Sequence, residues 1–182
     1  MVRRKAAAPS GRCLTVPVDF PPMPLRLDTR RLLLTPESAE DAGWFAELLT
    51  ARGGRVFSIE EARERIAVME TTIAALGIGA LVLRTRSDGA ALGYCALIVG
   101  RASLAEPELA YELLPAAHGQ GYATEAAGAM VEAGFATGRS RLWSTVRAWN
   151  APSLRVLDKL GFHRHHITTD DDGGLLWLRR DR

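Results

Sequence analysis

The chain has 182 residues, a formal net charge of +2, 47% hydrophobic residues and 24% charged residues. This length allows one domain with a substantial core and is short for two domains. The nearly balanced charge argues against a nucleic-acid partner, and no run reaches the roughly 18 apolar residues of a membrane span. The two cysteines, Cys13 and Cys95, form neither a disulfide framework nor a zinc-binding spacing, which favours a reducing cytoplasm.

The first 24 residues differ in composition from the rest of the chain. Their basic start, Arg3 to Lys5, is not followed by the apolar segment of a signal peptide. Ala6-Ala7-Ala8-Pro9-Ser10-Gly11 and four further prolines follow instead, and such a segment buries too little surface to order itself. We therefore expect residues 1–24 to form a flexible N-terminal extension and residues 25–182 to form the domain.

The remaining chain alternates between strand-like and helix-like patterns. Ser58 and Glu61 have the spacing of a capping box, and Ser87-Asp88-Gly89 is typical of a hairpin turn. The expected elements are a strand ending at 34, helices over 39–49 and 58–75, strands over 80–85, 91–100 and 109–114, a helix over 125–136, a strand over 141–146, a helix over 154–160, and strands over 162–168 and 175–178. Gly93 suggests a bulge. This order predicts an α/β (α+β) fold with a mixed sheet.

A glycine-rich stretch, His118 to Glu125, lies between the expected strand 109–114 and the helix that follows it. Its two glycines tolerate positive φ and allow the backbone to approach a ligand. A helix start leaves its first amides unpaired and carries the positive end of the helix dipole. The combination predicts a phosphate site for a nucleotide-like or coenzyme ligand.

Two common phosphate-binding motifs fit the stretch poorly. A Rossmann fingerprint lacks its third glycine, because Thr124 stands there, and the acidic residue expected about 20 positions later is missing. A Walker loop is excluded because no Lys-Ser/Thr pair follows the glycines.

Two linked motifs indicate a family. His118 to Ala126 and Asn150 to Phe162 resemble the corresponding segments of the GNAT acyltransferase superfamily. Within it, Leu27 to Leu32 is similar to the opening strand of the RimJ/RimL-like N-terminal acetyltransferases of ribosomal proteins. The resemblance covers about residues 25–180. It implies the GNAT fold: a mixed, mostly antiparallel seven-stranded sheet, about four flanking helices, and splayed fourth and fifth strands.

The resemblance also implies acetyl-CoA as co-substrate, with no metal. The glycine loop would hold the pyrophosphate, backbone groups of Leu113 and Leu114 would pair with the pantetheine arm and polarise the thioester carbonyl, and Asn150 would bond the pantetheine amides. The full set of implied coenzyme contacts is Leu113, Leu114, His118, Gly119, Gln120, Gly121, Tyr122, Ala123, Thr124, Asn150 and Ser153. His118 departs from the family, whose loop usually begins with Gln or Arg.

Three residues are candidates for the chemistry. An amine must lose a proton before it attacks, and Glu112 and Glu108 are the candidate bases because they lie four apart on one strand face beside the implied thioester. Many family members carry a tyrosine acid where Leu157 stands, so the donor to the departing sulfur is either Ser153 or no residue, because a thiolate is a tolerable leaving group. Neither motif contains a cysteine, which favours direct transfer over an acyl-enzyme.

The acceptor stays open. A protein N-terminal α-amine is first choice, by analogy with the RimJ/RimL-like group. A small-molecule amine (a polyamine, an amino acid or an aminoglycoside) is the alternative, as is a non-catalytic acyl-CoA-binding sensor. A homodimer is compatible with the resemblance. The histidine run from His163 to His166 suggests a metal site, but strand alternation would place His166 on the face opposite His163 and His165.

Overall fold

The computed structural model describes residues 20–182 of the chain. The expected flexible extension therefore lies mostly outside the described residues, since residues 1–19 are not among them. Met23 is described and is buried in the core, and its amide donates a hydrogen bond to the carbonyl of Gly77 at 2.8 Å. The packed chain thus includes Met23, two residues before the expected start of the domain at residue 25.

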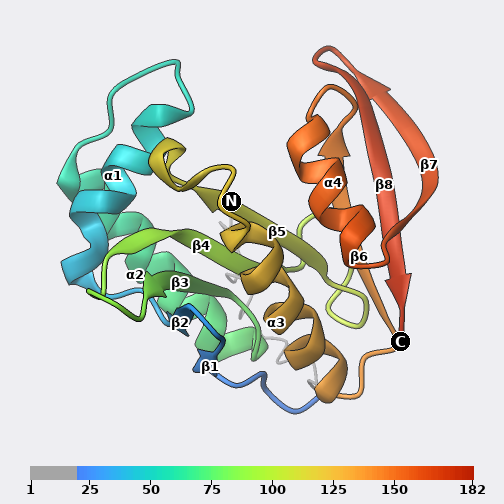
Figure 1. Cartoon of the computed structure of the whole chain (residues 1–182), viewed down its shortest axis with the longest axis horizontal. Coiled ribbons are helices and arrows are strands. Elements are labelled where there is room, and N and C mark those ends of the chain that lie inside the picture. Colours follow the sequence, from blue (N-terminus) through green and yellow to red (C-terminus); the bar gives the residue numbers. More distant parts are fainter. Residues whose placement is uncertain (1–19) are drawn as a thin grey trace, which may run out of the picture.

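Within residues 20–182 the chain forms eight strands and four α-helices (Figure 1). In chain order these are β1 Leu27–Asp28, β2 Leu32–Thr35, α1 Ala42–Ala51, α2 Ile59–Leu76, β3 Ala80–Thr85, β4 Ala91–Ile98, β5 Glu108–Leu113, α3 Tyr122–Ala136, β6 Arg141–Arg147, α4 Ala151–Lys159, β7 His163–Asp170 and β8 Gly173–Asp181. Short 3₁₀ turns precede α1 (η1, Ala39–Asp41) and α3 (η2, Pro115–Ala117). The capping box of α2 is present, with the Ser58 hydroxyl accepting from the Glu61 amide.

All eight strands belong to one sheet, in the order β1-β2-β3-β4-β5-β6-β8-β7. Every neighbouring pair is antiparallel except β5 and β6. The mixed, mostly antiparallel sheet is confirmed, but the expected count of seven strands is wrong by one. Residues 27–35 form two strands instead of one because Thr29 closes a turn: its amide donates to the Leu32 carbonyl and its hydroxyl accepts from the Leu32 amide.

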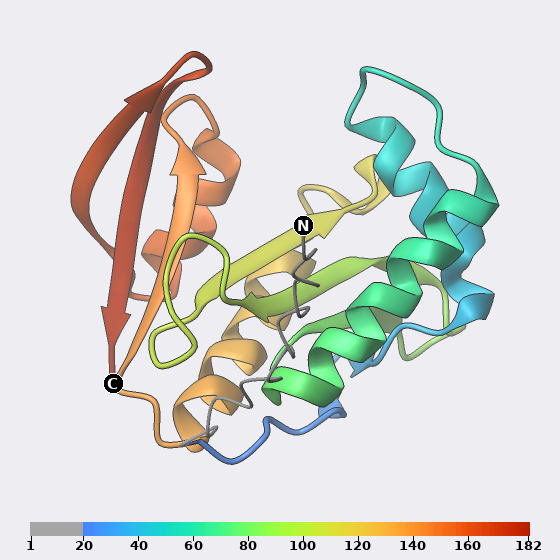
Figure 2. The same ribbon diagram turned by 180° about the vertical axis from the view of Figure 1, so that it is seen from behind.

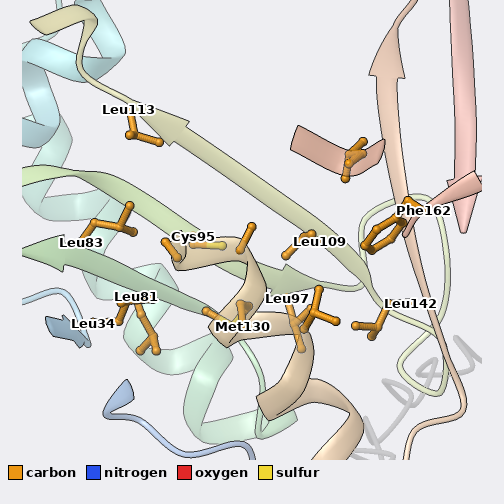
Figure 3. Packing of buried hydrophobic residues seen from close by; sticks show 14 of the residues in the cluster. Leu34, Leu81, Leu83, Cys95, Leu97, Leu109, Leu113, Met130, Leu142 and Phe162 are labelled. Atoms are coloured by element: carbon orange, nitrogen blue, oxygen red, sulfur yellow. The ribbon is translucent and has the colours of Figure 1, made fainter. Parts of the chain in front are cut away.

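Helices cover both faces of the sheet (Figures 1 and 2). On one face α1 and α2 pack together around Phe45, Leu49 and Ile66, with Tyr94 of β4 at the edge of this cluster. On the other face α3 crosses the strands, and Figure 3 shows its Met130 among the leucines of β3 and β4. α4 packs into the same cluster as α3, because its Leu157 is buried there. The α1/α2 pair and the α3/α4 pair therefore lie on opposite faces of β5.

The pairing of β5 with β6 is confined to the start of both strands. Glu108 lies opposite Trp143, the Trp143 amide donates to the Pro107 carbonyl at 2.9 Å, and the Ser144 hydroxyl donates to the Leu109 carbonyl at 3.0 Å. Beyond these contacts the two strands diverge in both views (Figures 1 and 2). The expected splay of the fourth and fifth strands of the predicted order is confirmed.

Two irregularities in the ladders bear on the sequence expectations. The register of β3 and β4 shifts beside Gly93, and a side chain there would overlap the Glu112 carbonyl, so the expected bulge is confirmed. A second shift lies between Arg164 and His166 of β7. The expected separation of His165 and His166 onto opposite faces is therefore wrong: the rings of both lie edge-on to Trp143.

Two further findings concern metals and membranes. Within residues 20–182, no three His, Cys, Asp or Glu side chains come together as a metal site. None of the helices in this part of the chain is long and apolar enough to span a bilayer.

Candidate active site

The glycine loop presents a row of backbone amides at the start of α3. Gly119 and Gly121 adopt left-handed φ values of 74° and 80°, and Gly121 is the N-cap of the helix. Within the described residues, the amides from Gly119 to Thr124 donate to no backbone or side-chain acceptor. A β-carbon added to Gly119 would meet nothing within 4 Å, so this side of the loop is open. The loop is built to receive an anion.

The loop is held in place by its own side chains and by the turn between β1 and β2. His118 Nε2 lies 2.9 Å from the Leu113 carbonyl and therefore carries the proton, and the Gln120 amide group donates to the Ala116 carbonyl at 2.9 Å. From the turn, the Arg31 guanidinium donates to the Gln120 carbonyl and lies 4.4 Å from the centre of the Tyr122 ring. These contacts keep the amides pointing outward before any ligand arrives.

Glu125 connects the same turn to the first turn of α3. Its carboxylate accepts hydrogen bonds from the Thr29 hydroxyl and from the amide and guanidinium of Arg31. Partial burial raises the pKa of Glu125, but these hydrogen bonds outweigh it, so that its pKa lies below the ordinary value. The residue acts as a clamp and also offsets the positive end of the helix dipole.

The end of β5 exposes backbone groups to the gap between β5 and β6. The Leu114 amide donates to the Leu92 carbonyl at 2.8 Å, so it faces β4 and is already occupied. Because hydrogen-bonding directions alternate along an antiparallel pair, the amide of Leu113 faces the gap instead. Of the two residues expected to contact the coenzyme here, the structure leaves the Leu113 amide free for a ligand and the Leu114 amide engaged.

Glu108 and Glu112 lie on the α1/α2 side of β5 but have different surroundings. Glu108 is 3% exposed and sits where β5 pairs with β6. Its carboxylate accepts from the Arg101 amide and from the Thr145 hydroxyl, the latter at 3.0 Å. Each of its two buried oxygens therefore has a hydrogen-bond donor. Glu108 therefore joins the loop after β4 to β6 at the closed end of the gap.

Glu112 lies near the open end, where it meets an arginine from α1. The Arg52 Nε lies 2.8 and 3.0 Å from the two carboxylate oxygens, and its Nη2 also contacts the carboxylate. The Tyr94 hydroxyl is 3.3 Å from Glu112 Oε2 and 3.4 Å from Arg52 Nη2. Burial, followed by the charge of Glu112, raises the pKa of Tyr94 to about 12, so its hydroxyl stays protonated.

The first turn of α4 lies across the gap from β5. Asn150 caps this helix, with its side-chain oxygen accepting from the Ser153 amide at 3.2 Å. Because of that cap, α4 begins at Ala151, three residues before the expected start. The Tyr111 hydroxyl donates to the Ser153 carbonyl at 3.1 Å. Burial raises the pKa of Tyr111 to about 12, and a side-chain hydrogen bond with Ser153 acts in the opposite direction.

Sequence reasoning missed four residues that shape this site: Arg31, Arg52, Tyr94 and Tyr111. Each acts across 40 or more positions of sequence or from a neighbouring strand, so no local spacing signals its partner. The structure gathers the glycine loop, Leu113, Glu112 and the Asn150–Ser153 turn around the open end of the gap, and it leaves Glu108 at the closed end.

One further buried carboxyl lies beside this site. Glu37 is 5% exposed, and within the described residues neither of its oxygens has a hydrogen-bond partner. Burial, with the nearby charges of Asp41 and Glu70, raises its pKa to about 7. Asp41 itself is paired with Arg84, whose Nη2 lies 2.6 and 2.8 Å from its oxygens.

Comparison with known proteins identifies the family. Residues 31–163 match the family model described as an acetyltransferase (GNAT) domain, whereas no curated protein sequence matches the chain. A structure from Bordetella pertussis, described as a GnaT-family acetyltransferase, is 25% identical with a TM-score of 0.73, over 85% of this chain and 98% of that one.

Two structures of lower identity share the fold. RimJ of Mycobacterium smegmatis, in complex with CoA-disulfide, is 18% identical with a TM-score of 0.73, over 86% of this chain and 87% of that one. The ribosomal-protein-S5-alanine acetyltransferase of Vibrio fischeri is 16% identical with a TM-score of 0.72, over 87% of this chain and 97% of that one. Since the family match spans most of the chain, the protein belongs to the GNAT acetyltransferases, a family of N-acetyltransferase enzymes that use acetyl-CoA.

Proposed function

We propose that this acetyltransferase binds acetyl-CoA in the gap between β5 and β6 and transfers the acetyl group directly to a protein N-terminal α-amine. The observation that carries the proposal is the row of free amides from Gly119 to Thr124 at the open end of that gap. A pyrophosphate needs several fixed donors and a close backbone approach, and the two left-handed glycines supply both.

The remaining contacts follow the same gap. The Leu113 amide is available to a carbonyl lying beside β5, and the free NH₂ group of Asn150 is available from the opposite side. His118, whose ring hydrogen is already held by the Leu113 carbonyl, braces the loop and adds no direct ligand in this arrangement. Acetyl-CoA supplies the acetyl group as a thioester, which needs no further activation by a metal.

The proton chemistry is assigned to two residues. Glu112 is the proposed base, because it lies at the open end, is partly exposed and has a neutral hydroxyl, that of Tyr94, beside it. The acceptor ammonium loses one proton to Glu112 before it attacks; as the C–N bond then forms and the C–S bond breaks, the nitrogen loses a second proton and the sulfur takes up one. The hydroxyl of Ser153, in the first turn of α4, is the proposed donor to that sulfur. Glu108 is saturated by its donors and is assigned a structural role.

The acceptor assignment rests on the RimJ/RimL-like character of the sequence motifs. Two proteins with the same fold are described as RimJ and as a ribosomal-protein-S5-alanine acetyltransferase, which favours a protein N-terminus over a small molecule. Their identity to this chain is 18% and 16%, so they support the choice by analogy of fold.

Release of free thiol from acetyl-CoA, measured with a panel of amines, tests the proposal. The panel contains peptides with free α-amines beginning with Ala, Ser or Met, the same peptides with acetylated N-termini as matched controls, a polyamine, an amino acid and an aminoglycoside. We expect turnover with free-amine peptides and none with their controls. Turnover with the small amines alone would show that the acceptor is a small molecule and not a protein N-terminus. Thermal stabilisation by coenzyme without any turnover would indicate a sensor, and the absence of both would overturn the proposal.

A further inference from the structure

Both carboxylate oxygens of Glu112, the proposed base, are engaged by the guanidinium of Arg52. Arg52 is the C-cap residue of α1. Its guanidinium binds both carboxylate oxygens of Glu112 and lies 3.4 Å from the Tyr94 hydroxyl. A carboxylate engaged on both oxygens by a guanidinium has little room for a second cation in the same plane. A protonated amine and Arg52 therefore compete for the same oxygens.

The chemistry of the two competitors is alike. An acceptor amine reaches an enzyme mainly as an ammonium ion, which is a cation with several N–H donors, as is a guanidinium. The charge of Arg52 is permanent here, because hydrogen bonding to Glu112 raises its pKa above the already high ordinary value. Arg52 thus satisfies Glu112 in the way that an incoming ammonium would.

The pair is built to separate easily. The Arg52 side chain is 43% exposed and that of Glu112 is 28% exposed, so water screens their attraction and competes for both groups. Gly53 and Gly54 follow Arg52 with φ values of 83° and 90°, and side chains placed on either would meet nothing within 4 Å. The two residues after Arg52 therefore have open space beside their Cα atoms.

The opposite end of this loop is held more firmly. The Arg55 guanidinium lies 3.8 Å from the centre of the Phe57 ring and 2.6 Å from Glu61, and the Phe57 amide donates to the Thr50 hydroxyl. Arg55 thus forms an ion pair of similar exposure in the same loop, but away from β5. It provides a matched control for any effect of removing a loop arginine.

We propose that Arg52 is a placeholder in the acceptor site: its guanidinium occupies the position of the acceptor ammonium on Glu112 and is displaced when the acceptor binds. This inference rests on the proposed function, because it takes Glu112 to face the acceptor. It makes Arg52 a determinant of acceptor affinity, selecting amines that bind Glu112 well enough to replace it. A purely structural tether from α1 to β5 would predict no such competition.

A binding experiment tests this without turnover. Propylammonium and propylguanidinium are titrated into the wild-type protein, Arg52→Gln and Arg55→Gln, and ligand-observed NMR gives the dissociation constants. Because a partly exposed ion pair is weak, we expect Arg52→Gln to bind both cations about fivefold more tightly than the wild type. Arg55→Gln should bind them as the wild type does. Adding Glu112→Gln to Arg52→Gln should abolish the gain.

The outcomes separate this inference from the proposed function. Equal affinity in Arg52→Gln and the wild type would overturn the placeholder role, as would an equal gain in Arg55→Gln. If Arg52→Gln does not fold, Arg52→Lys keeps the charge but loses the paired contacts, and a smaller gain in cation affinity is expected. With any acceptor that turns over, Arg52→Gln should lower its KM more than it changes kcat. Loss of turnover by every variant and the wild type would instead count against the proposed function alone.

Discussion

The two ends of β5 each carry a glutamate on the same face of the strand. The two glutamates differ in their burial and in their hydrogen-bond partners. Glu108, at the closed end, is buried and bonded to a backbone amide and a hydroxyl that belong to the fold. Glu112, at the open end, is partly exposed and paired with an arginine at the end of α1. The first carboxylate is therefore enclosed by the fold, whereas the second, with its arginine partner, is in contact with solvent. Divergence of β5 from β6 within one strand length produces the difference.

Removing each carboxylate in turn tests whether Glu108 and Glu112 have different roles. Glu112→Gln should lower kcat by about 10²- to 10⁴-fold, since it removes the proposed base, and should change the free energy of unfolding little. Glu108→Gln should instead lower the free energy of unfolding by about 1–3 kcal/mol, because an NH₂ group would face one of its two donors. Steady-state kinetics and urea denaturation measure the two effects. Equal effects of both changes on kcat would show that the two ends do not differ in role.

The glycine loop provides the second test, since it belongs to the open end alone. Gly121→Val places a β-branched residue at a φ of 80° and beside the Arg31 guanidinium, which should displace the amides of the loop. We expect a loss of coenzyme affinity of about 100-fold or more, measured by calorimetry. Gly138→Val is the control: Gly138 has a φ of 91° in the turn after α3, and a β-carbon added there would meet nothing within 4 Å. Gly138→Val should have the same backbone strain as Gly121→Val but bind the coenzyme as the wild type does. Unchanged coenzyme affinity in Gly121→Val would contradict the assignment of the loop as the phosphate site.

A third carboxyl allows a comparison between a buried carboxyl with hydrogen-bond donors and one without them. Glu37 is as buried as Glu108 but has no donor in the described part of the chain, and its pKa rises to about 7. Its folded pKa lies above the ordinary value of 4.5, so its contribution to stability is present below pH 4.5 and is lost as the pH rises through 7. The shift corresponds to about 3 kcal/mol.

Glu37→Gln should therefore be more stable than the wild type at pH 8 and similar to it at pH 4, as measured by urea denaturation across this range. The exposed Glu60 of α2 offers a control, because Glu60→Gln should leave the pH dependence unchanged. Parallel stability curves for Glu37→Gln and the wild type would mean that Glu37 is charged and paired in solution.

The smallest expected effect concerns the far side of the gap. Ser153→Ala removes the hydroxyl, while the contact of Tyr111 with the Ser153 carbonyl is kept. Stability and coenzyme affinity should stay nearly constant. Turnover should fall by about tenfold if the hydroxyl donates to the sulfur. An unchanged turnover rate would remove Ser153 from the mechanism and leave the thiolate to depart without a protein donor.

Sequence patterns predicted the local elements well and the contacts between them poorly. The strand over 80–85 was predicted to the residue, and the bulge at Gly93 was anticipated, because alternation and glycine geometry are short-range properties. The extra strand in residues 27–35 was missed, since a single Thr29 hydroxyl makes the turn that divides it. The bulge in β7 was also missed, because strand alternation is valid only while the ladder is unbroken.

The sequence by itself determined the unpaired amides of the loop from His118 to Glu125. Two left-handed glycines followed by a helix start create free amides whatever surrounds them. Only the tertiary structure decided the surroundings of the two glutamates of β5, which share one strand face. Arg52 lies 60 residues from Glu112, and packing of α1 against the sheet brings them together. Thr145 lies 37 residues from Glu108, and the pairing of β5 with β6 brings these two together. Local backbone geometry produces the first feature, whereas long-range packing produces the second.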